Sequence, residues 1–296
     1  MNNLLLITAL LSSACFVPPS TMTQAQKPAY QLYTSKGSPL HYDSMIQQLT
    51  RANVVLFGEL HNDALVHWLE LQVVKDLFAQ DSNLMIGAEM FETDNQLLLD
   101  EFVAGTIEER HFEQEAKLWN NYATDYAPIL AFAKQNHIPV IATNVPRRYA
   151  SLVAREGLSQ LDSLPAQAKE LMAPLPLKVD LSLPGYQKMV GMMGGNSSHG
   201  AMSGENIANA QALKDATMAH FILLNRTQQA TLLHLNGSYH SDNFEGIHWF
   251  IQQSSPETTV TTISCVAQAD IRKLYEEHVG VADIIIVVPE DMTKTY

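Results

Sequence analysis

Short apolar runs recur along the chain, separated by longer stretches in which apolar and polar residues mix. Six of these runs are NVVLFG (53–58), LMIGAEM (84–90), IPVIATN (138–144), ATLLHLNG (230–237), TTVTTISC (258–265) and DIIIVVP (283–289). Several of them are continuous rather than alternating, which is typical of strands that are covered on both faces. Each run therefore predicts a strand in the interior of a sheet.

The stretch that follows the first run has the periodicity of a helix. Within residues 63–80, Val66, Leu69, Val73 and Leu77 follow one another at spacings of three and four residues, so they fall on one helical face. Strands that alternate with helices indicate a largely parallel sheet flanked by helices. We therefore predict an α/β fold whose main domain comprises residues 30–150 and 205–296.

The segment between the third and fourth runs, residues 145–229, is too long for one crossover connection. We expect residues 151–204 to form a smaller helical cap domain, and residues 205–224 to form a long helix that leads back to the sheet. The cap is interrupted by four prolines, which are Pro165, Pro174, Pro176 and Pro184.

The N-terminus has the pattern of a bacterial export signal. The apolar run at residues 4–11 is too short to cross a bilayer as a helix, and small residues precede Cys15. Residues 1–15 therefore predict a signal peptide with a lipobox, lipidated at Cys15; an ordinary secretory signal cleaved near Ala14 is the alternative. Phe16 replaces the Asp that retains lipoproteins in the inner membrane, so we expect anchoring in the bacterial outer membrane.

Composition narrows the classes of partner and cofactor. The net charge of −13 and the pI of about 5.2 argue against a nucleic-acid partner. With Cys15 lipidated, Cys265 has no partner in the chain, so a disulfide or a Cys-rich metal site is excluded. The apolar neighbours of Cys265 predict a buried, inert thiol. Residues 16–29 are rich in Pro, Ser, Thr and Gln, and we interpret them as a tether.

Polar side chains stand at or just beyond the ends of the first four runs. They are Glu59, His61, Glu89, Asn144, Asn236 and His240. The carboxyl ends of parallel strands meet at one edge of a sheet, where α/β folds bind ligands. Any one of these residues could simply lead out of a strand, and His61, Asn62 or Asp63 could cap the next helix. Taken together they predict a site at that edge.

An ordered set of sequence blocks identifies a family resemblance. VVLFGELHNDALVHW, GAEMFETDNQ, WNNYATDYAPILAFAKQNHIPVIATNVPRRYASLVAREG, AQALKDATMAHFI and LLHLNGSYHSDNFEGI occur in this order. Together they resemble the ChaN-like family of haem-binding bacterial lipoproteins, in the wider Tiki/TraB/erythromycin-esterase-like superfamily. The resemblance implies a parallel-sheet domain with a smaller helical domain. It also implies haem uptake, with haem held by a Tyr ligand between two subunits, and a haem-uptake receptor as a candidate partner.

The segment NVPRRYASL contains the ligand that we expect for the haem iron. Pro146 suits the first position of a helix, which would place Arg147, Arg148 and Tyr149 in its first turn. The helix dipole and the two Arg charges would lower the cost of deprotonating Tyr149, and Arg can pair with a propionate. On spacing alone, the two Arg could equally form a solvated face and Tyr149 a packing residue; the resemblance favours ligation.

Other haem contacts are open alternatives. His199 could reach a propionate in its own subunit or across a dimer. Tyr122, Tyr126 and Tyr239 are further candidate ligands, although the first two, with Trp119, are more typical of a core stripe. No partner is evident for five other histidines, which we interpret as structural or surface residues: His67, His111, His137, His220 and His234.

The superfamily also supplies a rival function. The chain has two Gly-x-x-His motifs, one ending at His61 and the other at His240. With Glu59 and Glu89, they would provide enough ligands for a divalent metal with an open water position, as a metal-dependent hydrolase requires. A nucleotide-binding loop, a Gly-x-Ser-x-Gly elbow and a His-Glu-x-x-His motif are all missing from the sequence.

Overall fold

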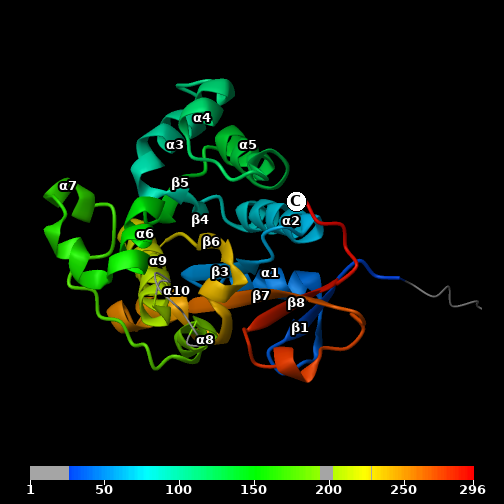
Figure 1. Ribbon diagram of the computed structural model, residues 1–296. Coiled ribbons are helices and arrows are strands. Elements are labelled where there is room, and N and C mark those ends of the chain that lie inside the picture. Colours follow the sequence, from blue (N-terminus) through cyan, green and yellow to red (C-terminus); the bar gives the residue numbers. More distant parts are fainter. Residues whose placement is uncertain (1–26, 194–202, 228) are drawn as a thin grey trace, which may run out of the picture.

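A single mixed sheet forms the centre of the protein in the computed structural model, which describes residues 27–193, 203–227 and 229–296 (Figure 1). The strands are β1 (Gln31–Thr34), β2 (Pro39–Leu40), β3 (Val54–Glu59), β4 (Met85–Glu92), β5 (Val140–Asn144), β6 (Leu232–Gly237), β7 (Val260–Gln268) and β8 (Ile284–Pro289). Their order in the sheet is β2-β1-β8-β7-β3-β6-β4-β5. All six predicted strands are present.

The prediction of a largely parallel sheet is confirmed. Strands β3 to β8 pair with one another in parallel, whereas β1 pairs antiparallel with both β8 and β2. The sequence analysis did not include the β1–β2 hairpin, because these strands are too short to stand out as apolar runs. The hairpin adds an antiparallel edge far from the polar strand ends.

Helices cover both faces of the sheet (Figure 1). One face carries α1 (Tyr42–Leu49), α2 (Ala64–Gln80), α3 (Gln96–Val103), α4 (Glu109–Glu115) and α5 (Ala127–Asn136), the last preceded by a π-helical turn, η2 (Tyr122–Tyr126). The other carries α8 (Pro184–Met193), α9 (Gly204–Asn225) and α10 (Gly246–Ser254). Helix α6 (Arg147–Glu156) lies beside α9, with α7 (Ala166–Lys169) farther out (Figure 1). Short 3-10 turns are η1 (Thr93–Asn95), η3 (Leu158–Ser163), η4 (Ser238–His240), η5 (Asp242–Phe244) and η6 (Glu276–His278).

Strand β3 shows why the apolar runs are continuous. Val55 and Phe57 pack into the hydrophobic cluster beneath α2, whereas Val54 and Leu56 pack into the cluster beneath α9. All four side chains are fully buried. Because successive side chains of a strand point to opposite faces, a strand between two helical layers is buried on both faces and is mostly apolar. Each such side chain contributes about 1.5–3 kcal/mol through its burial.

Helix α2 follows the predicted pattern closely. Its predicted apolar face, including Val66 and Leu69, is buried, and the helix begins after Asp63. The Asp63 carboxylate accepts the backbone N–H groups of Leu65 and Val66 at 3.1 and 3.2 Å, so Asp63 is the helix cap. The capping alternative therefore holds for Asp63, and it leaves Glu59 and His61 free for other contacts.

The segment predicted as a cap packs directly on the rest of the chain. Ala173 and Tyr186 belong to the same hydrophobic cluster as Val54 of β3, and α6 packs along α9. The long helix predicted for residues 205–224 is α9. Outside residues 1–26, 194–202 and 228, none of the helices combines the length and apolarity needed to cross a membrane.

Candidate functional site

The polar strand ends meet at the carboxyl edge of the sheet, as predicted. Strands β3, β6, β4 and β5 are consecutive neighbours, and Glu59 of β3 lies in register with Gly237 of β6. The register between β4 and β5 shifts after Ala88, and this irregularity contains Glu89. The Asn144 side-chain amide donates to the Glu89 carbonyl at 3.0 Å. Bulges of this kind re-aim side chains near functional sites.

Glu89 and His240 form the first of two polar groups at this edge. Glu89 Oε2 accepts the Gly237 backbone N–H at 2.8 Å, and Glu89 Oε1 lies 3.0 Å from His240 Nε2. The other ring nitrogen of His240, Nδ1, pairs with Asp215 of α9, which also accepts the Tyr186 hydroxyl at 2.7 Å. Asp215 and Tyr186 were not predicted, because nothing in a continuous helical segment marks which side chain reaches the edge.

The electrostatics of this group favour a charged pair. Burial alone would lower the pKa of His240, but the Glu89 and Asp215 carboxylates outweigh it and raise the pKa to about 10. Burial would raise the pKa of Glu89, but His240, His61 and the Gly237 N–H lower it to about 2. His240 is therefore an imidazolium whose two N–H groups both face carboxylates.

Glu59 and His61 form the second group. His61 Nδ1 lies 2.7 Å from Glu59 Oε1, which also accepts the Tyr126 hydroxyl at 2.7 Å. The His61 ring stands edge-on to Trp119, with 5.0 Å between the ring centroids, and its side chain is 38% exposed. Burial would lower the pKa of His61, but Glu59 and Glu89 raise it above the usual value. The ring also lies against Gly237, where an added Cβ would be only 2.6 Å from His61 Nε2.

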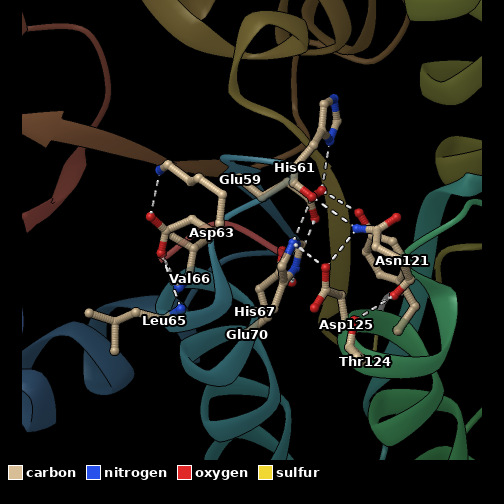
Figure 2. Close-up of polar contacts among 12 residues, drawn as sticks. Glu59, His61, Asp63, Leu65, Val66, His67, Glu70, Asn121, Thr124 and Asp125 are labelled. Atoms are coloured by element: carbon tan, nitrogen blue, oxygen red, sulfur yellow. Dashed lines mark hydrogen bonds and ion pairs between the residues drawn. The ribbon is translucent and has the colours of Figure 1, made fainter. Parts of the chain in front are cut away.

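A third group, beneath Glu59, corrects the prediction that His67 has no partner. His67 Nδ1 lies 2.8 Å from Glu70 Oε2, and His67 Nε2 lies 3.1 Å from the His61 carbonyl (Figure 2). Both residues lie on the first two turns of α2 and are buried. Burial raises the pKa values of Glu59 and Glu70 to about 8, aided by the Glu70 charge at Glu59 and by the Asp125 charge at Glu70. The available signal was a His and a Glu three residues apart on the buried side of an apolar helix.

His234 and Cys265 behave as structural residues. His234 is fully buried between Thr143 Oγ1 at 2.8 Å and Asn236 Oδ1 at 3.0 Å, and burial lowers its pKa to about 4. Burial likewise raises the pKa of the Cys265 thiol well above its ordinary value, as expected for an inert thiol.

An open cavity of about 1010 Å³ lies beside the Glu89 group, between α6 and α9. Its apolar lining includes Leu118, Trp119, Val145, Ala150, Ala154, Ile207 and Ala210. Its cations are Lys117, Arg147, Arg148 and Lys214. A cavity of this size is at the upper end of the range for small-molecule and cofactor sites.

The predicted helix N-terminus lies at this cavity. Pro146 is the residue before the first helical turn, and α6 begins at Arg147. Arg147 and Arg148 line the cavity, but Tyr149 does not. Tyr149 is half-buried against the hydrophobic cluster of α6 and α9, with the Arg148 guanidinium 4.5 Å from its ring centroid. Arg148 also pairs with Asp94.

The other candidate ligands differ in accessibility. Tyr122 and Tyr126 are buried, in agreement with a core stripe, and Tyr239 is 43% exposed and donates to the Gly185 carbonyl at 2.7 Å. His199 and Cys15 lie outside the described residues. Tyr296, which the sequence analysis did not consider, lines the cavity.

Comparison with known proteins agrees with the fold and the sequence blocks. A family model described as haem-binding uptake, Tiki superfamily, ChaN, matches residues 45–251. No curated protein matches the chain. ChaN of Campylobacter jejuni, in a structure of cofacial haem binding, gives a TM-score of 0.68 at 17% identity, covering 88% of this chain and 96% of that one. At 17% identity, this structural similarity shows that the two chains share a fold.

A succinoglycan biosynthesis protein gives a TM-score of 0.51 at 10% identity, covering 86% of this chain and 94% of that chain. An erythromycin esterase mutant in its open conformation gives a TM-score of 0.45 at 12% identity, covering 80% of this chain and 77% of that chain. The family match confirms the resemblance inferred from the sequence, and haem, the predicted cofactor, is the ligand that the family description names.

Proposed function

We propose that this chain, which belongs to the haem-binding uptake family ChaN of the Tiki superfamily, binds haem beside the N-terminus of α6 and serves haem acquisition. The observation that carries the proposal is the open cavity at this helix, whose mixed lining contains apolar side chains and four cations, which outnumber its two glutamates, Glu89 and Glu92. Haem needs an apolar surface for the macrocycle and positive charge for its two propionates. The residues present satisfy both requirements.

The cations differ in how free they are to bind a propionate. Arg148 pairs with Asp94, and Lys117 pairs with Glu92 and Asp94. Among the described residues, neither Arg147 nor Lys214 has an ion-pair partner. We therefore assign propionate binding to Arg147 and Lys214, with Arg148 in support; bidentate pairing favours Arg for a carboxylate. His199 remains a proposed additional contact.

Tyr149 is the proposed axial ligand of the haem iron. It lies in the first turn of α6, with the Arg148 guanidinium 4.5 Å from its ring centroid, and Tyr is an established axial ligand of haem iron. When bound, a Tyr-ligated ferric haem suits storage and transfer. Tyr149 does not line the cavity, whereas Arg148 lines the cavity and also lies against the Tyr149 ring. We therefore propose that the haem lies at a boundary between two protomers, in a haem-bridged homodimer. A haem-uptake receptor is the proposed recipient or donor.

The test is a haemin titration of the purified chain, followed by absorbance and size-exclusion chromatography together. Wild-type protein should show a Soret band typical of a Tyr-ligated ferric haem and should shift to a dimer. Tyr149→Phe should lose this spectrum, and Arg147→Gln with Lys214→Gln should keep the spectrum but weaken binding by about 10–100-fold, the equivalent of roughly 1.4–2.8 kcal/mol.

Tyr296→Phe is the matched control, because Tyr296 is an exposed tyrosine that lines the same cavity. It should leave the spectrum and the dimer unchanged. If Tyr296→Phe removes the spectrum and Tyr149→Phe does not, the ligand assignment is wrong. A chain that binds no haemin would overturn the function itself.

A metal-dependent hydrolase is the second candidate, and one observation favours it. His61 has Nδ1 held by Glu59, while its partly exposed ring leaves Nε2 available as a general base. The four proposed residues Glu59, His61, Glu89 and His240 do gather at one edge, but His240 directs both ring nitrogens at carboxylates. A metal there would have to displace these pairs. The deciding measurement is hydrolysis of a model ester that is lost in His61→Ala.

We also propose that the mature chain is a lipoprotein anchored through Cys15 in the bacterial outer membrane. The support is the signal-like sequence of residues 1–15 and the tether-like composition of residues 16–29.

A further inference from the structure

Three buried side chains beneath the sheet edge form a compact ligand set, here called the buried cluster. Glu59 is the last residue of β3, and His67 and Glu70 lie on α2 (Figure 2). One ligand atom from each of the three lies within 4.8 Å of the others. Figure 2 shows that His61 lies on the opposite side of Glu59 from His67 and Glu70, so the cluster is separate from the Glu59–His61 contact.

The tautomer of His67 follows from its neighbours. Nε2 lies 3.1 Å from the His61 carbonyl oxygen and 3.5 Å from Asp125 Oδ2. Both atoms are hydrogen-bond acceptors, so Nε2 carries the hydrogen. In the neutral ring, Nδ1 is then the nitrogen with the lone pair.

This lone pair faces two carboxylates. Nδ1 lies 2.8 Å from Glu70 Oε2 and 3.9 Å from Glu59 Oε2. A lone pair at these distances from carboxyl oxygens needs either a shared proton or a metal ion between them.

The carboxylates are also incompletely paired. Both side chains are fully buried, and within the described part of the chain Glu59 Oε2 and Glu70 Oε1 have no hydrogen-bond partner. A buried acceptor without a partner costs about 1–3 kcal/mol, and more when it is charged. The geometry therefore has a place for one cation, which is either a proton shared by the carboxyl groups or a metal ion.

We propose that the buried cluster binds one divalent first-row transition-metal ion through Glu59, His67 and Glu70. Two carboxylates balance the charge of such an ion, and a mixed oxygen and imidazole-nitrogen set suits zinc, manganese or iron. The His67 Nε2–H bond to a backbone carbonyl is the outer contact that metal-bound histidines usually make.

The ion would connect two elements at the base of the site. Glu59 would hold it through Oε2, while Glu59 Oε1 continues to accept the Tyr126 hydroxyl and to contact His61. The end of β3 would thus be tied to α2. The proposal does not depend on haem binding. The site shares Glu59 with the set of Glu59, His61, Glu89 and His240, but its other ligands are His67 and Glu70.

The experiment refolds the full chain from denaturant and chelator, with Zn²⁺ or Mn²⁺ present or absent, and measures bound metal by mass spectrometry and the Tm. Refolding gives the ion access to a buried site. Wild-type protein should retain about one metal per chain and melt at a higher temperature with metal. The near-isosteric Glu70→Gln variant should bind the metal at least ~10–100-fold more weakly.

Glu89→Gln is the matched control, because it alters the other buried glutamate at the same edge. It should retain the metal. Loss of metal in Glu89→Gln but not in Glu70→Gln would place the ion among Glu59, His61, Glu89 and His240, and it would overturn the proposal. Wild-type protein that takes up no metal and has the same Tm in both refolding conditions would show that a proton fills the cluster.

X-ray absorption of the metal-loaded wild type provides a test that requires no variant. The buried cluster predicts one imidazole among the scatterers. Two imidazoles would indicate His61 and His240 and would contradict the assignment even if Glu70→Gln failed to fold.

Discussion

At His240, carboxylates from two different elements meet one imidazole ring. Glu89 approaches from β4 and Asp215 from α9, and the ring is buried between them. A charge buried in this way is stabilised only by its partners, because removing one partner leaves the other charge without compensation. The ring therefore serves to join the sheet edge to the helix behind it.

The pH dependence of this contact has a definite sign. The pKa of His240 is raised to about 10, so its stabilising effect is complete below its ordinary value of 6.5 and is lost as the pH rises through 10. The pKa of Glu89 is lowered to about 2, so its effect is present above 4.5 and is lost as the pH falls toward 2.

We predict that His240→Gln lowers the free energy of unfolding by about 3–5 kcal/mol at pH 6 and by progressively less as the pH approaches 10. The measurement is denaturant unfolding across this pH range. Glu59 and Glu70, whose pKa values are raised, lower the stability of both proteins alike as the pH rises from about 4.5 to 8, so the difference reports His240 together with its effect on Glu89. A difference that does not change with pH would contradict the assignment of a charged His240.

At the scale of elements, the site depends on how closely two strand ends approach. Gly237 ends β6 directly beneath the His61 ring, which belongs to the loop after β3. Only a residue without a side chain leaves room for the ring, since Cβ would lie 2.6 Å from both Cε1 and Nε2. The glycine of the second Gly-x-x-His motif therefore positions the histidine of the first.

We predict that Gly237→Ala displaces His61 from Glu59 and returns the pKa of His61 toward its ordinary value. The pKa can be followed by NMR titration of the His61 ring. Gly191→Ala in α8 is the control, because its Cβ would meet none of the described residues within 4 Å, and a helical Gly→Ala change is neutral or slightly stabilising. An unchanged His61 titration in Gly237→Ala would show that the ring does not depend on this contact.

At the scale of the whole molecule, charge is distributed unevenly. The chain carries a net charge of −13, yet four cations line the cavity beside α6. Local positive charge in an acidic protein points to an anionic ligand rather than to a general affinity for polyanions. The propionates of haem fit this pattern.

The proposed attachment of the chain to the membrane depends on Cys15. Cys15→Ser removes the sulfur that would carry lipid, so we expect the protein to leave the membrane fraction and the mature chain to lose the mass of its acyl groups. Fractionation and mass spectrometry of intact protein measure both effects. Cys265→Ser is the control, because that thiol is buried and should not affect anchoring. Membrane retention of a Cys15→Ser protein whose signal peptide has been removed would contradict a lipid anchor, because this variant has no sulfur at residue 15 to carry lipid.

The sequence by itself determined the six parallel strands, the sheet that they form and the edge at which its polar residues meet. These follow from patterns local in the chain: a strand between two helical layers is mostly apolar, and polar residues gather where such strands end. Glu59, His61, Glu89 and His240 were found for this reason.

Only the tertiary structure decided which of these residues touch. Asp215 and Glu70 come from the interior of helices, where helical phase and packing, rather than spacing from a strand, determine what a side chain reaches. The same applies to Tyr149, which directly follows two cavity-lining arginines in the sequence but packs against the hydrophobic cluster of α6 and α9. Pairing and pKa shifts depend on burial and on distances between distant segments, and these exist only once the layers have packed.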